Sequence, residues 1–314
     1  MYGKMENITQ QKWRCFGKSV RGTYHWRSEL RNQDAIQWYP GHPETGVGLP
    51  VILAVSDGHG SAKSFRSEKG SQFAVSTAIR VIQEFFLATQ NSDINFSTLK
   101  DGTERLLPQR LVSEWRTFVQ QHLQEHPFTD EERQNLVKED GESAWKAVED
   151  NNFLAYGATL LAVLVTESFI VYIQLGDGDI LEVDSQGETT RILERDPRLI
   201  ANETTSLCMN KAWNEFQIHL EQYPKGISKE MPALILVSTD GYSNSFSTDE
   251  GFFKIGKDYL NMFKSNSAEE VSKKLGDFLE ETSDKGSGDD ITLGIIRRAE
   301  NDDWDLVDLA LSPL

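Results

Sequence analysis

Six short runs of apolar and β-branched residues constrain the fold of this 314-residue chain more than any other feature of its sequence. Their residues are apolar either consecutively or at every second position, which is typical of β-strands. The runs cover residues 51–55, 159–165, 169–175, 180–183, 233–237 and 291–296. Since 38% of the residues are hydrophobic, the chain can bury a sizeable core, and we expect one large domain or two small ones.

Helices are predicted by apolar spacing, or by a run of charge, over residues 64–87, 108–123, 131–149 and 268–281. They alternate irregularly with the strands, and the chain has no GxGxxG turn, so the sequence favours an α+β fold over a dinucleotide-binding fold. Residues 169–183 predict a β-hairpin that turns at residues 176–178 and continues a meander from the preceding run. The segment 189–232 has few strand signals and is interpreted as a lid or insertion.

The charge of the chain excludes one class of partner. Its 32 lysines and arginines stand against 49 aspartates and glutamates, a net charge of −17, whereas a nucleic-acid-binding protein needs a basic face. The N-terminus lacks a secretory signal and no apolar run is long enough to cross a membrane, so we expect a cytoplasmic protein without a membrane partner. Cys15 and Cys208 form no CxxC pair and are interpreted as ordinary thiols.

Aspartates stand at the edges of three predicted strands. Asp57 lies in PVILAVSDGHG, Asp240 in ALILVSTDGYSN and Asp289 in GSGDDITLGII. If these strand edges converge, the carboxylates form an all-oxygen site of the kind that Mg²⁺ and Mn²⁺ prefer. Two such cations can supply hydroxide near neutral pH and stabilise an in-line displacement at phosphorus. The pattern therefore favours metal-assisted phosphoryl chemistry.

Six motifs follow one another along nearly the whole chain: SVRGTYHWRSELRNQDAIQW, ILAVSDGHGSAKSFRSEKGSQFAV, YGATLLAVLV, YIQLGDGD, LILVSTDGYSN and GDDITLGII. Together they resemble the metal-dependent protein phosphatases of type 2C, and the first two resemble a bacterial branch of that family. The resemblance implies a four-layer α-β-β-α sandwich with two central antiparallel sheets. Residues 1–300 would form the catalytic domain. From its composition, the acidic, amphipathic tail 301–314 is expected to dock as a helix, and a partner-binding peptide is the alternative.

The resemblance also implies the ligands of two Mn²⁺ or Mg²⁺ ions. Asp57 would bridge the ions, and Asp34 matches an acidic position that binds a metal directly or through water. Asp177 matches the aspartate of a turn associated with a weaker third metal, although a plain hairpin turn is the alternative. The full set of implied ligands is Asp34, Asp57, Gly58 through its carbonyl oxygen, Asp177, Asp240 and Asp289.

Several residues depart from the family pattern. Gln33 stands where many relatives have glutamate, and a neutral amide puts the affinity for the second metal in doubt. Gly178 and Asp179 replace a Ser-Arg pair, and Asn244 replaces a second aspartate of the third-metal site. Asp290 stands where asparagine is common, and is expected either to support the metal ligands or to cap the strand.

Two histidines and an arginine are expected near the substrate. His59, in DGHG, resembles a family histidine that protonates the leaving alkoxide, a task that suits a group with an ordinary pKa near 6.5. The alternative is that His59 only orients metal-bound water. In much of the family an arginine holds the phosphate, but the spacing here is altered, so either His25 or Arg21 is expected in that role.

The sequence thus predicts a serine/threonine phosphatase that hydrolyses phosphoproteins by direct attack of a metal-bridging water, within a cognate kinase system. The alternative is a catalytically weak or inactive phosphoprotein-binding regulatory module on the same fold. The departures at Gln33, Gly178, Asp179 and Asn244 motivate that alternative. A calcium-binding domain is disfavoured, because GDGDILE lacks the twelve-residue loop with a terminal glutamate that an EF-hand has.

Overall fold

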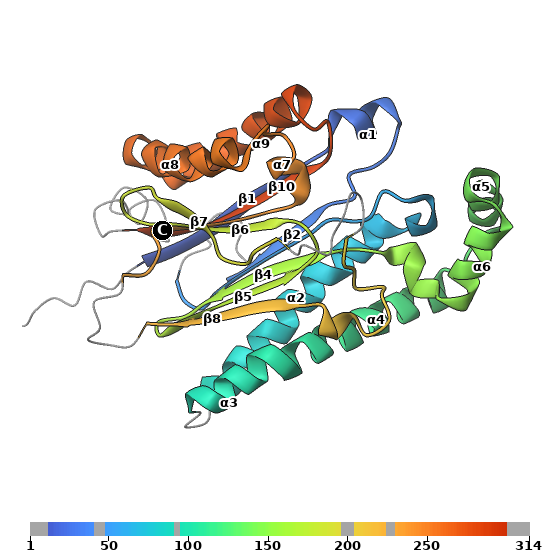
Figure 1. Ribbon diagram of the computed structural model, residues 1–314, viewed down its shortest axis with the longest axis horizontal. Helices are drawn as coiled ribbons and strands as arrows, with labels where there is room; N and C mark the ends of the chain where they lie inside the picture. The colour runs from blue at the N-terminus through green and yellow to red at the C-terminus, as the bar shows by residue number, and fades with distance from the viewer. Residues whose placement is uncertain (1–11, 41–47, 91–94, 196–203, 224–229, 300–314) are drawn as a thin grey trace, which may run out of the picture.

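Two antiparallel sheets pack face to face in the computed structural model, which describes residues 12–40, 48–90, 95–195, 204–223 and 230–299 (Figure 1). The first sheet has the order β1-β10-β9-β6-β7 and the second has the order β2-β3-β4-β5-β8. The strands of the first sheet are β1 (Lys12–Val20), β6 (Asp179–Val183), β7 (Thr189–Arg191), β9 (Leu234–Ser238) and β10 (Ile291–Ala299). Those of the second are β2 (Ala35–Tyr39), β3 (Val51–Ser56), β4 (Leu160–Val165), β5 (Phe169–Leu175) and β8 (Gln217–Gln222).

Helices cover the outer face of each sheet. The long α2 and α4 lie on the second sheet, and α8 and α9 lie on the first (Figure 1). The helix bounds are α1 (Thr23–Arg27), α2 (Ser67–Gln90), α3 (Phe96–Asp101), α4 (Leu107–Glu125), α5 (Asp130–Asp140), α6 (Glu142–Asp150), α7 (Asp240–Ser243), α8 (Asp249–Ser265) and α9 (Ala268–Lys285). None of the helices in the described ranges is both long and apolar enough to span a membrane.

The layering explains the apolar runs of the sequence. Successive side chains of a strand point to opposite faces of its sheet. In β3, Leu53 and Val55 belong to the core between the sheets, whereas Ile52 and Ala54 belong to the core under α2 and α4. Both faces are buried, so consecutive positions are apolar. The predicted α+β fold and four-layer arrangement are confirmed.

The predicted hairpin over residues 169–183 is wrong. β5 pairs with β4 and β8 in the second sheet, while β6 pairs with β9 and β7 in the first. The turn at residues 176–178 therefore carries the chain from one sheet to the other. Both strands are apolar on both faces, so their composition does not reveal which strand lies beside which. The β4–β5 part of the predicted meander is confirmed.

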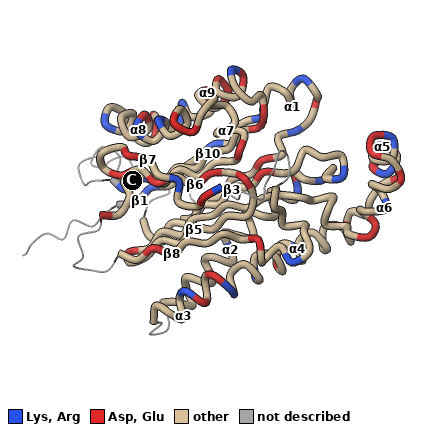
Figure 2. Tube along the Cα trace, viewed as in Figure 1, with Lys and Arg blue, Asp and Glu red and all other residues tan. Residues whose placement is uncertain are grey.

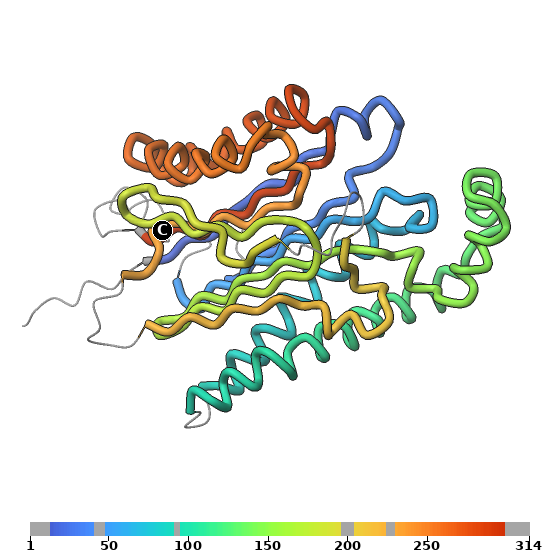
Figure 3. The backbone as a smooth tube through the Cα atoms, in the orientation of Figure 1, coloured from blue at the N-terminus to red at the C-terminus, as the bar shows by residue number. Residues whose placement is uncertain are grey.

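Several elements had not been predicted. β1 and β2 lie in the N-terminal region, and Figure 3 shows β1 running beside β10 at the other end of the chain. The segment 189–232, interpreted as a lid or insertion, contributes β7 and β8 at the edges of the two sheets. The helix α8 also has no predicted counterpart. The expected C-terminal helix in the tail lies outside the described residues.

Candidate active site

Three aspartates meet where the two sheets adjoin. Asp57 follows β3, Asp177 lies in the crossover from β5 to β6, and Asp240 begins α7 directly after β9. One carboxylate oxygen from each residue lies within 4.8 Å of those from the other two. The structure thus brings together two of the aspartates that follow predicted strands, together with Asp177, for which a plain turn had been the alternative.

Two further predicted ligands lie close to this cluster. Asp34 is buried just before β2, and its Oδ2 accepts a hydrogen bond from Thr239 Oγ1 at 2.8 Å. Asp289 precedes β10, and its side chain is 51% exposed and faces the cavity described below. The charges of both residues raise the pKa of Asp57, so they act on the same site.

The carboxylates repel one another. Burial, followed by the charges of Asp34 and Asp240, raises the pKa of Asp57 well above its usual range. Burial and the charge of Asp290 raise the pKa of Asp34 to about 8, and burial and the charge of Asp177 raise that of Asp240 to about 7. A divalent cation would relieve this repulsion, and clustered carboxylate oxygens are its preferred donors. The residues present therefore fit Mg²⁺ or Mn²⁺.

Hydrogen bonds fix the Asp57 loop on the strand opening at residues 157–159. The backbone N–H of Asp57 donates to Thr159 Oγ1 at 2.9 Å, and the N–H of Thr159 donates to the Asp57 carbonyl at 2.8 Å. Ser56 Oγ donates to the Thr159 carbonyl at 2.6 Å. These contacts pack the opening of β4 beneath the site.

Close packing also explains the first glycine of DGHG, Gly58. A Cβ on Gly58 would lie 2.7 Å from the carbonyl oxygen of Gln33, so a larger residue would displace the backbone. His59 packs over Gly157, where a Cβ would lie 2.6 Å from the imidazole ring. Burial lowers the pKa of His59, and this residue is not among the described residues that line the cavity. His59 thus packs behind the Asp57 loop, and its role as a proton donor stays a prediction.

His25 occupies the position expected for a group that meets substrate. It lines the cavity, and its Nε2 lies 3.8 Å from Asp289 Oδ1 while its Nδ1 lies 2.8 Å from Asp290 Oδ2. The Nδ1 contact is short but is not aligned as a linear hydrogen bond. The contact with the Asp290 carboxylate raises the pKa of His25 by more than burial lowers it, so the pKa is raised.

Arg21, the other residue expected to bind phosphate, points elsewhere. Its guanidinium stacks on Trp26, with 4.2 Å to the ring centroid, and donates to the carbonyl oxygen of His25 at 2.9 Å. Among the described residues that line the cavity there is no arginine and no lysine. The structure therefore does not support a phosphate-binding role for Arg21.

The departures from the family pattern have local physical reasons. Asn244 Nδ2 donates to Asp240 Oδ2 at 2.8 Å, so the asparagine orients this carboxylate. A Cβ on Gly178 would lie 2.4 Å from the Ser238 carbonyl oxygen, which leaves no room for serine. Asp179 is buried and paired with Arg191 at 2.6 Å.

Gln33 lies at the cavity. It is one of the lining residues, and a Cβ on Gly60 would lie 3.8 Å from its Oε1. The amide is therefore close to the glycine loop that follows Asp57.

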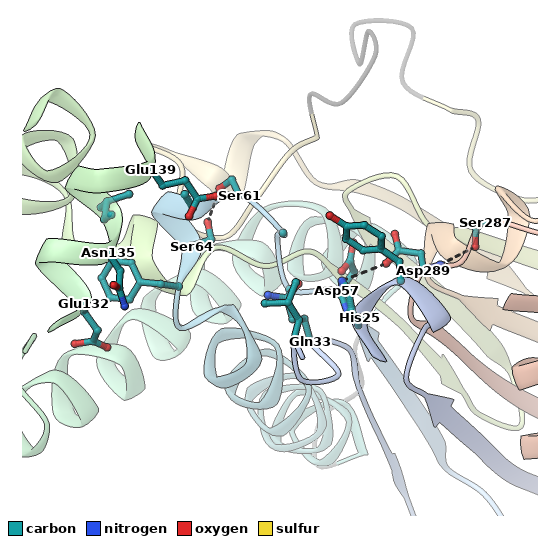
Figure 4. Close-up of a pocket in the computed structure, with 17 residues that line it drawn as sticks. His25, Gln33, Asp57, Ser61, Ser64, Glu132, Asn135, Glu139, Ser287 and Asp289 are labelled. Atoms are coloured by element: carbon teal, nitrogen blue, oxygen red, sulfur yellow. Dashed lines mark hydrogen bonds and ion pairs between the residues drawn. The ribbon is translucent and has the colours of Figure 1, made fainter. Parts of the chain in front are cut away.

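A cavity of about 740 Å³ opens at Asp57 and Asp289 (Figure 4). His25, Asp57 and Asp289 line one end of it, and the loop and 3₁₀ turn after β3 contribute the middle. The far wall is α5, through Glu132, Asn135, Leu136 and Glu139. Sequence reasoning missed this wall, because residues 131–149 carry only a helical charge pattern, and tertiary packing alone places them beside the aspartates.

Comparison with known proteins agrees with this geometry. A family model described as protein phosphatase 2C matches residues 21–280. No curated protein matches the chain.

Solved structures of phosphatases match along most of the chain. The catalytic domain of the serine/threonine phosphatase PstP, in complex with two manganese ions, is 18% identical with a TM-score of 0.51, covering 93% of this chain and 100% of that one. PstP/Ppp from Mycobacterium tuberculosis is 16% identical with a TM-score of 0.50, covering 92% and 100%. Stp1 from Staphylococcus aureus is 14% identical with a TM-score of 0.54, covering 96% and 100%. At these identities the similarity establishes the fold.

Proposed function

The chain belongs to the protein phosphatase 2C family, and we propose that it is a protein phosphatase that removes phosphate from phosphoserine and phosphothreonine with the help of two Mn²⁺ or Mg²⁺ ions. The observation that carries the proposal is the convergence of Asp57, Asp177 and Asp240 to within 4.8 Å. The two manganese ions of PstP support the same cofactor. The substrates would be phosphoproteins produced by a serine/threonine kinase.

We assign the cations to the carboxylate cluster, with Asp57 at its centre. When bound, two such cations supply a hydroxide near neutral pH and neutralise phosphate oxygens. The protein contributes fixed carboxylate positions, because Thr239 holds Asp34 and Asn244 holds Asp240 by hydrogen bonds. Supporting hydrogen bonds of this kind orient metal ligands. The remaining ligands we assign are the Gly58 carbonyl, Asp177 and Asp289.

We assign the contact with substrate to His25 rather than to His59. Because its pKa is raised, His25 carries a proton over more of the neutral range than an ordinary histidine does. Its Nδ1 faces the buried Asp290, so Nε2, which lies 3.8 Å from Asp289 Oδ1, is the nitrogen that would donate to a phosphate oxygen or to the departing alkoxide oxygen. The pairing with Asp290 also fixes the ring orientation.

The test is hydrolysis of a small aryl phosphate and of a phosphothreonine peptide with Mn²⁺, with Mg²⁺ and with EDTA. We expect turnover that requires metal and that Asp57→Asn lowers by at least about 100-fold, since this change removes a charged ligand from the centre of the cluster. Asp284→Asn, the same change at an exposed position of α9, is the matched control and should retain turnover.

Turnover by Asp57→Asn at the parental rate would contradict the assignment. If no metal supports turnover but the protein binds the phosphopeptide, the regulatory binding module replaces the phosphatase as the function. Circular dichroism of each variant separates loss of catalysis from loss of fold.

A further inference from the structure

The cavity is larger than a phosphate group requires. Its volume of about 740 Å³ lies within the range of roughly 300–1,000 Å³ that is usual for ligand sites. Asp57 and Asp289 lie at one end, and the α5 wall lies at the other, with Gln33 between them in Figure 4. A phosphorylated side chain that reaches Asp57 therefore leaves its flanking residues to lie against α5.

The lining of this cavity is anionic. Its charged side chains among the described residues are Asp57, Glu132, Glu139 and Asp289, with His25 as the one basic group. Both signs of charge occur along α5 (Figure 2), but Arg133 turns toward Glu142, 3.7 Å away, and Lys138 does not line the cavity. The α5 face that substrate meets is thus acidic.

The two glutamates of the wall differ in their partners. Glu132 Oε1 and Oε2 accept hydrogen bonds from Arg66 at 2.6 and 2.8 Å, so its charge is neutralised within the protein. Glu139 is exposed, and within the described ranges it makes no hydrogen bond or ion pair. Its carboxylate therefore remains free to meet a cation from substrate.

The wall is held in place by Arg66, two residues after the 3₁₀ turn that lines the cavity. Besides Glu132, its guanidinium donates to the carbonyl oxygens of His126 and Pro127 and to the hydroxyl of Tyr156. These bonds tie the α4–α5 connection and the start of α5 to the loop that carries Asp57. Glu139 is consequently presented by a helix whose start is fixed to the site, so that its side chain, but not its backbone, has to be ordered on binding.

Apolar side chains accompany the free carboxylate. Leu136 of α5, Phe65 and Leu30 line the cavity, and Leu30 is 41% exposed. The methylene stem of a lysine or arginine packs well on such a surface while its charged head meets a carboxylate.

We propose that α5 is the substrate-recognition wall and that Glu139 selects phosphoproteins with a lysine or arginine close to the phosphorylated residue. This inference rests on the proposed phosphatase function. A neutral or acidic neighbour would leave Glu139 unpaired or would be repelled by the anionic lining. The ion pair is partly exposed, so the selectivity is modest and weakens with added salt.

The test compares three phosphothreonine peptides that differ only in having lysine, alanine or glutamate beside the phosphothreonine. With Mn²⁺ at low salt, we expect kcat/KM to be about two- to five-fold higher for the lysine than for the alanine peptide, the range of an exposed ion pair. Glu139→Gln should bring this ratio close to one, and Glu139→Asp should retain part of it. Asp140→Asn, at the next exposed position of α5 but outside the cavity lining, should leave the ratio unchanged.

The inference would be overturned by a ratio of kcat/KM near one between the lysine and alanine peptides in the wild type. It would also be overturned if Glu139→Gln had the same ratio as the wild type. In both cases turnover itself would still support the phosphatase function. If a small aryl phosphate is not hydrolysed with any metal, the phosphatase proposal fails instead. Fluorescence anisotropy with the same labelled peptides then decides the inference independently. Tighter binding of the lysine peptide that Glu139→Gln abolishes supports it, and equal binding of the three peptides overturns it.

Discussion

A single buried carboxylate, Asp290, connects three parts of the site. Its Oδ1 accepts a hydrogen bond from the backbone N–H of Gly22 at 2.7 Å, and its Oδ2 accepts one from that of Gln33 at 2.7 Å. The same Oδ2 lies 2.8 Å from His25 Nδ1. The sequence did not decide whether Asp290 supports the metal ligands or caps the strand, because its partners lie near the opposite end of the chain. In the structure Asp290 holds the backbone on both sides of α1 and faces His25.

Replacement of Asp290 by asparagine tests this connection. The variant loses the carboxylate whose direct contact, and to a lesser extent whose charge, raises the pKa of His25, so this pKa should fall toward or below 6.5. A raised histidine pKa contributes stability that is present below the unfolded-state value and is lost as pH rises through the folded-state value. The variant should therefore be destabilised most at acidic pH. Histidine titration by NMR and urea unfolding at pH 5.5 and 8 measure both effects.

Asp284→Asn again serves as the control, and it should leave both the His25 titration and the pH dependence of unfolding unchanged. An Asp290→Asn variant in which His25 titrates as in the parent would show that burial geometry, rather than the carboxylate charge, sets this pKa.

At the scale of elements, the sequence predicted which segments form strands better than it predicted which strands pair within a sheet. The apolar runs of β3, β4 and β5 are confirmed because burial on both faces leaves a plain signal. The β5–β6 hairpin was wrong because a strand that is buried on both faces gives no sign of its sheet. The approach of α5 to the site had no local signal, since the side chains that anchor it, led by Arg66, act across the fold.

Two glycines inside helices give opposite predictions. A Cβ on Gly70, in α2, would lie 1.9 Å from the Tyr156 carbonyl oxygen, whereas one on Gly276, in α9, meets only the flexible Lys18 side chain at 3.5 Å. Gly70→Ala should lower the free energy of unfolding by about 1–3 kcal/mol or more through overpacking. Gly276→Ala should raise it by up to about 1 kcal/mol through helix propensity. Urea unfolding of both variants checks the signs.

If the two substitutions changed the free energy of unfolding equally, α2 would be able to move away from the turn before β4 at little cost in free energy. Loss of the Trp115 Nε1 hydrogen bond to the Gly70 carbonyl, 3.0 Å in the parent, would accompany such a movement. Tryptophan fluorescence can report that change.

At the scale of the whole molecule, the two sheets bring their aspartates together at a cost in electrostatic free energy. Without a cation, the folded protein holds protons on Asp34, whose pKa rises from 3.8 to about 8, and on Asp240, whose pKa rises from 3.8 to about 7. The unfolded chain releases these protons near pH 4. The folded state therefore binds more protons than the unfolded state between these values, and stability must fall as pH rises through that range.

Metal reverses this trend, because a bound cation takes the place of those protons. We expect the unfolding midpoint in EDTA to decrease from pH 6 to pH 8, and the increase produced by Mn²⁺ to be larger at pH 8. Asp34→Asn should flatten the EDTA profile, since it removes the group with the higher of the two raised pKa values, whereas Asp284→Asn should not. Differential scanning calorimetry at pH 6, 7 and 8 measures this. A Mn²⁺ effect independent of pH would mean that the cation binds away from the aspartates on which the two sheets converge.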